Sequence, residues 1–203
     1  MKFPFIIILI FIPLIVLSQN YKLNTRYPGY FINIKGDSIH GYILLTNKLE
    51  NQRGAVYSSD AKGEKIIIHL LADQVRGYKV KDRTYTAMYY GEPDPAAEHF
   101  VLTVAEGNLD LYEYFTLPDE FYVGTNTGGQ RPATGDDEQY LQKEFLIVNK
   151  EGNKFMLPNA NAFMKNADLI FGSNADLLQK IKDKKKGYRY NDLEEIVKEF
   201  NLQ

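Results

Sequence analysis

The chain has 203 residues, with 24 basic against 26 acidic side chains and no cysteine. The lack of cysteine excludes disulfides, thiolate metal sites, a thiol nucleophile and a lipid anchor attached to an amino-terminal cysteine. The near balance of charge gives no long-range field that would attract nucleic acid or an anionic membrane, so we expect no nucleic-acid partner.

The first 18 residues have the pattern of a secretory signal peptide. Lys2 supplies a positive start, Phe3–Leu17 is almost entirely apolar, and Ser18 is a small residue before a cut at Gln19. The apolar stretch is shorter than the roughly 20 residues of a transmembrane helix, and Pro13 interrupts it. A removed signal peptide is therefore favoured over a retained anchor. We expect an exported protein, periplasmic or extracellular, with no stable membrane span after removal of residues 1–18.

Three β-hairpins are predicted from apolar segments that flank a Gly followed by Asn or Asp. Glycine reaches positive φ without steric cost, which suits such turns. The segments are Tyr30–Ile34 and Ile39–Leu45 around Gly36, Phe100–Ala105 and Leu109–Phe115 around Gly107, and Phe145–Val148 and Phe155–Leu157 around Gly152.

Further short strands are predicted between the first two hairpins, at Ala55–Ser58, Ile66–Leu70, Val75–Val80 and Thr84–Tyr90. Fifteen Tyr and twelve Phe add a bias toward strands. Regular short strands of this kind predict a mainly β (α+β) fold for residues 19–158, as an antiparallel meander that forms a small barrel or a sandwich.

Residues 159–203 change to a helical period, which predicts two or three helices. The first has an apolar stripe from Ala160 to Ile170, the second begins after Ser173 and stops at Gly187, and the third begins at Asn191. The stripe of the third helix is Leu193, Ile196, Val197 and Phe200. Because helices this short are unstable alone, we expect them to pack on the β domain.

The segment 117–139 is predicted to be a long irregular loop, since it holds four glycines and two prolines. A loop of this length is disordered, a simple crossing connection or a binding flap. Its acids, Asp119, Glu120 and Asp136–Glu138, are the carboxylates that a hydrolase could use.

No residue pattern points to a known catalytic or metal site. His40, His69 and His99 lack the spacing of a metal motif, and no serine lies in a nucleophile elbow. We therefore predict no catalytic residue, no metal ligand and no cofactor.

One strand face is a candidate for ligand binding. Tyr112 and Tyr114 share a face with Asp110, opposite the face of Leu109, Leu111 and Phe115. If the leucine face is the core, the two rings point outward beside a carboxylate, which suits a glycan or an extended peptide. The alternative is that another element covers these rings as part of the core.

Two stretches, Gly29–Ile43 and Asp176–Asn201, resemble a group of uncharacterised exported β-rich proteins of Gram-negative bacteria with a C-terminal helical tail. The resemblance implies a β-rich body with helices after it, and it brings no activity. The function expected from the whole sequence is a non-enzymatic envelope or secreted module that binds a polypeptide or glycan partner. The alternative is a hydrolase that acts on envelope polymers.

Overall fold

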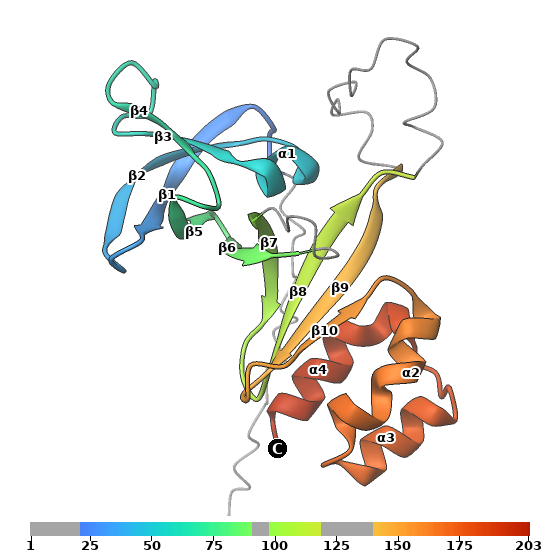
Figure 1. The fold of residues 1–203 in the computed structure, drawn as a ribbon. Helices are drawn as coiled ribbons and strands as arrows, with labels where there is room; N and C mark the ends of the chain where they lie inside the picture. The colour runs from blue at the N-terminus through green and yellow to red at the C-terminus, as the bar shows by residue number, and fades with distance from the viewer. Residues whose placement is uncertain (1–20, 91–97, 119–139) are drawn as a thin grey trace, which may run out of the picture.

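The computed structural model describes residues 21–90, 98–118 and 140–203, in which ten strands form one open antiparallel sheet (Figure 1). The strand order from edge to edge is β10-β9-β8-β7-β6-β5-β1-β2-β3-β4. The strands are β1 Thr25–Asn33, β2 Ser38–Leu45, β3 Ala55–Ser58, β4 Ile67–Leu70, β5 Val75–Val80, β6 Arg83–Tyr89, β7 Glu98–Ala105, β8 Leu109–Thr116, β9 Gln142–Asn149 and β10 Lys154–Leu157. The predicted mainly β, antiparallel fold is confirmed, and the described strands form an open meander rather than a closed barrel.

Two of the predicted hairpins use the same five-residue turn. The Asn33 backbone N–H donates to the Asp37 carbonyl at 3.0 Å, and the Asn33 side chain accepts from the Asp37 N–H at 2.9 Å. Asn149 and Asn153 repeat both bonds at 3.1 and 2.9 Å. Gly36 and Gly152 occupy the fourth position, with φ of 97° and 81°. The turn needs glycine there because other L-residues are strained at positive φ.

The first half of the sheet, with β6 and β7, encloses a core that we call the β core. Tyr78 and Tyr85 stack at its centre with ring centroids 4.7 Å apart, and Phe100 meets Tyr78 edge-on at 4.9 Å. Its buried members are Phe31, Ile43, Leu45, Ala55, Tyr57, Leu70, Ala72, Val75, Tyr78, Val80, Tyr85 and Phe100. Because seven strands contribute to one core, this part of the sheet must be strongly coiled.

The C-terminal helices cover one face of β8, β9 and β10 (Figure 1). They are α2 Ala160–Phe171, α3 Ala175–Lys182, the short 3₁₀ helix η3 Tyr190–Asp192, and α4 Leu193–Asn201. Their apolar stripes meet Leu109 and Leu111 of β8 and Phe145 and Ile147 of β9 in what we call the helix core. The predicted packing of the tail on the strands is therefore confirmed.

The ends of these helices differ from the predicted ones by a few residues. Asn174 rather than Ser173 caps α3, since its side chain accepts from the Leu177 N–H at 3.1 Å. The helix ends at Lys182, and Lys184 rather than Gly187 is the left-handed residue that follows it, with a φ of 52°. The N–H groups of Lys184 and the next residue bond back to the carbonyls of Ile181 and Lys180, which is a Schellman ending without glycine. The third helical segment begins with η3, not at an Asn191 cap.

A short helix that was not predicted, α1 Lys48–Arg53, contacts β3, β7 and β8 (Figure 1). Its buried residues are Leu49 and two polar residues, Asn51 and Gln52, which are 0% and 2% exposed. The Asn51 carbonyl accepts from the Tyr78 hydroxyl at 2.7 Å, and its side-chain oxygen accepts from the Thr46 hydroxyl at 2.7 Å. An apolar periodicity could not reveal this helix, because two of its three buried residues are polar.

Among the residues that the structure describes, no helix has the length and apolar character needed to cross a membrane.

Candidate functional site

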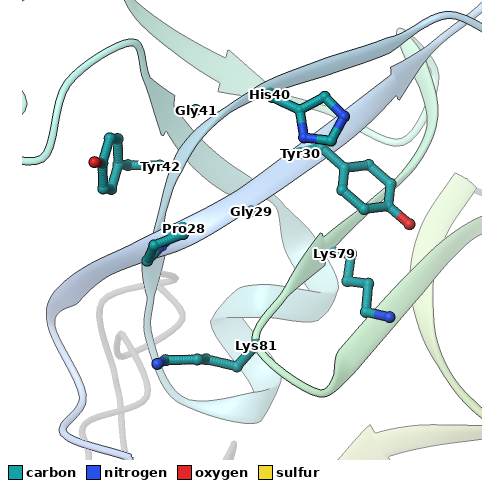
Figure 2. Close-up of a pocket in the computed structure, with 8 residues that line it drawn as sticks. All are labelled: Pro28, Gly29, Tyr30, His40, Gly41, Tyr42, Lys79 and Lys81. Atoms are coloured by element: carbon teal, nitrogen blue, oxygen red, sulfur yellow. The ribbon is translucent and has the colours of Figure 1, made fainter.

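A groove of about 440 Å³ lies on the face of the sheet where β2, β1 and β5 run side by side (Figure 2). Two tyrosines, a histidine, a proline and two lysines line it, together with two glycines. These residues are Pro28, Gly29, Tyr30, His40, Gly41, Tyr42, Lys79 and Lys81.

Strand register brings the side chains of this groove together. Tyr30 of β1 pairs with His40 of β2 on one side and with Lys79 of β5 on the other. Two residues earlier in β1, Pro28 pairs with Tyr42. Alternate residues of a strand point to the same face, so both rows project into the groove.

The glycines between these rows fix the shape of the sheet. Gly29 and Gly41 face each other across β1 and β2. A Cβ at Gly41 would lie 2.5 Å from the Tyr57 ring, and a Cβ at Gly29 would lie 2.3 Å from the Lys79 carbonyl oxygen. Side chains at either position would force the strands apart, so the close approach of backbone and ring beneath the groove depends on glycine.

The aromatic part of the groove is accessible. The rings of Tyr30 and His40 lie 5.3 Å apart and are inclined by 45°, with His40 exposed and Tyr30 half-buried. Figure 2 shows the two rings next to each other above the Lys79 side chain, while Tyr42 lies on the far side of Pro28. The groove therefore offers flat apolar surfaces with polar tips.

The charge of the groove is positive. Within the described part of the chain, neither Lys79 nor Lys81 forms an ion pair, and no Asp or Glu lines the groove. The Lys81 ammonium group lies 4.6 Å from the Tyr27 ring centroid and 5.5 Å from that of Tyr21, so cation–π contacts hold it. Rings with unneutralised cations favour a ligand that is anionic and has apolar faces.

The predicted site residues of β8 lie on another part of the sheet. Tyr112 is 6% exposed and packs with Tyr90, Val101 and Leu146 in a group that we call the tyrosine cluster. Burial, with Asp110 nearby, raises the pKa of Tyr112 to about 12. Its ring is thus covered, as in the alternative considered from the sequence.

The other two predicted site residues have structural contacts. The Asp110 carboxylate accepts from the Gly107 N–H at 3.0 Å and so holds the β7–β8 turn. Tyr114 is half-buried and stacks on Tyr90 with centroids 3.9 Å apart. Ligand binding by Asp110, Tyr112 and Tyr114 remains a prediction, and the groove on β1, β2 and β5 offers the more accessible rings.

A carboxylate does lie beside the tyrosine cluster. The Tyr90 hydroxyl donates to Glu144 at 2.6 Å, and the Thr116 hydroxyl donates to the second Glu144 oxygen at 3.4 Å. Burial and this carboxylate raise the pKa of Tyr90 well above its ordinary value. Glu144 therefore has a structural role as a hydrogen-bond acceptor. The loop acids Asp119, Glu120 and Asp136–Glu138 lie outside the described residues.

The three histidines lie on different strands, β2, β4 and β7. In the described ranges no group of three His, Asp or Glu side chains is arranged to hold a metal ion.

Comparisons of the chain with family models, with curated proteins and with solved structures find no match.

Proposed function

We propose that the protein is an exported, non-enzymatic envelope or secreted module that binds a partner, polypeptide or glycan, through the groove on β1, β2 and β5. The observation that carries the proposal is that Tyr30, His40 and Lys79 lie in one cross-strand row, beside the pair Tyr42 and Pro28. Two rings and a cation on an open surface provide stacking and charged contacts for a ligand.

The surroundings of the groove also support binding over turnover. General acid–base hydrolysis of a glycan needs carboxyl groups that face the scissile bond from two sides. No carboxylate lines the groove among the described residues. The side chains present there can stack on a ligand and neutralise its charge, which is sufficient for capture.

Export is the second part of the proposal. It rests on the leader pattern of residues 1–18 and on the absence of cysteine. The partner of an exported module lies in the periplasm or outside the cell, among envelope proteins and glycans.

The proposal is tested by capture from an envelope fraction of a Gram-negative bacterium on the immobilised exported protein. We expect Tyr30→Ala and Lys79→Gln to abolish capture with little change in melting temperature, since both side chains stand on the surface of the sheet. Tyr89→Ala is the matched control, because this tyrosine is 57% exposed and lies outside the groove. Equal capture by all variants, or turnover of an envelope polymer by the protein, would contradict the proposal.

A further inference from the structure

The class of ligand follows from where the groove lies in the sheet, and this step rests on the function proposed above. Backbone N–H and C=O groups of a sheet point along the plane of the sheet toward neighbouring strands. A ligand laid on the face therefore meets side chains alone. An extended peptide binds most readily by adding its own backbone to a free strand edge, and the groove on the face gives it no such edge.

The groove has a repeat along the strand direction. The first row is His40, Tyr30 and Lys79, and the second is Tyr42 and Pro28. Lys81 follows Val80, the last residue of β5, and lines the groove there, but its ammonium group lies over the Tyr27 and Tyr21 rings. Each row thus presents an apolar ring surface, and the first row also holds the Lys79 ammonium group.

The two rows together are long enough to contact more than one ring of a polymer. Residues two apart in a strand are separated by about 7 Å, since each residue advances the chain by about 3.4 Å. Two successive ring units of a chain could each lie on one row. A charged group on the ring unit that lies over the first row would then face Lys79.

We infer that the groove binds an acidic polysaccharide in which each sugar ring carries a carboxylate. The apolar face of a sugar ring stacks on Tyr30 or on the surface made by Tyr42 and Pro28. Its carboxylate accepts a charge-assisted hydrogen bond from Lys79. His40 beside Tyr30 adds a polar edge for hydroxyl groups.

The test uses three soluble probes with the exported protein in isothermal titration calorimetry. Oligogalacturonate has rings and carboxylates, its methyl ester keeps the rings without the charge, and oligoglutamate keeps the charge without the rings. We expect oligogalacturonate to bind, the other two to bind about tenfold more weakly or not at all, and the affinity to fall as salt screens the charges.

Variants connect the binding to the groove. Lys79→Gln and Tyr30→Ala should each weaken oligogalacturonate binding by about tenfold, the effect of losing one charge-assisted hydrogen bond or one stacked ring. Lys65→Gln and Tyr89→Ala, at exposed positions outside the groove, should leave it unchanged.

Each other outcome overturns the inference. Equal binding of the methyl ester would remove the acidic requirement, and equal binding of oligoglutamate would make the ligand an acidic peptide. Failure of all three probes would reject this polysaccharide class, whereas loss of envelope capture in Tyr30→Ala would still support the proposed function. The two proposals can therefore fail separately.

Discussion

At the scale of single residues, an amide side chain from a helix bonds each end of β8. Gln52 of α1 donates to the Phe115 carbonyl at 2.9 Å and accepts from its N–H at 2.7 Å. Asn201 of α4 makes the same pair of bonds with Leu109, at 2.8 and 2.9 Å. Strand β7 pairs with β8 only at Glu113, Tyr112 and Leu111, so the two amides complete the hydrogen bonding where the neighbouring strand is missing.

We predict that Gln52→Leu destabilises the protein strongly. It leaves two buried backbone groups of Phe115 without partners, at a cost of roughly 1–3 kcal/mol each. Asn201→Leu should cost less, because this end of β8 is only partly buried and water can replace the amide. Urea unfolding measures both changes.

Arg53→Ala is the control for Gln52→Leu, since Arg53 lies on the exposed side of the same helix. If Gln52→Leu were no more harmful than this control, the Phe115 backbone would have to find other partners.

His99 makes the stability dependent on pH. Burial, with Arg53 nearby, lowers the pKa of His99 below its ordinary value of 6.5. Between the folded and unfolded pKa values the unfolded chain binds more protons, so stability falls as the pH drops below about 6.5. We predict that His99→Gln loses less stability than the parent between about pH 7.5 and about pH 5, as measured by urea midpoints. Parallel curves for the two proteins would contradict this role.

Gly152 tests the turn chemistry in isolation. Nothing lies within 4 Å of a Cβ built there, so a substitution meets only the backbone strain of its φ of 81°. Gly152→Val should cost about 1–2 kcal/mol, and Gly152→Asn should cost less because Asn tolerates positive φ. Thermal melts should therefore show a larger drop in melting temperature for Gly152→Val than for Gly152→Asn. A larger drop for Gly152→Asn would mean that the turn relaxes.

At the scale of elements, α4 holds the tail to the sheet. Leu193, Ile196 and Val197 are fully buried, whereas Phe200 is only partly buried against Phe171, with ring centroids 5.7 Å apart. Ile196→Ala should then cost roughly 2–5 kcal/mol, as a fully buried large-to-small change does. Phe200→Ala should cost less than a fully buried Phe would.

Glu195→Ala, on the exposed side of α4, provides the baseline for both, and urea unfolding measures all three. If Ile196→Ala lowered the stability no more than Glu195→Ala does, the tail would not be packed as described.

The elements that the sequence predicted well are those with local causes. The Gly36 and Gly152 hairpins follow from five consecutive residues, and the stripe of α4 follows from its own period. The errors at helix ends arise where two neighbouring residues can both cap, as with Ser173 and Asn174. Helix α1 was missed because two of its three buried residues, Asn51 and Gln52, are polar and bond to partners that are distant in sequence.

At the scale of the whole molecule, the candidate groove shows the limit of a single sequence. The hairpin around Gly36 places Tyr30 opposite His40, which a register argument can reach. The lysines join them only because β5 pairs with β1, the one pairing in the sheet between strands that do not follow each other. No local pattern specifies that pairing, so the positive side of the groove was not predicted.

The amino-terminal segment of the chain is predicted to be removed during export. If residues 1–18 are a removed signal peptide, mass spectrometry of the exported protein should find Gln19 at its amino terminus. An intact Met1 in the membrane fraction would show instead that the segment is a retained anchor.

The strand order also has a consequence for a chain that is made from its amino terminus. Each strand after β1 can join a partner that has already been synthesised, because even β5 adds to the free side of β1. The helices α2 to α4 follow the strands that they cover, so Leu109, Leu111, Phe145 and Ile147 have no cover from these helices until α4 has been made. An unfinished chain therefore presents this apolar face to its surroundings, and it is the surface that a chaperone would have to hold.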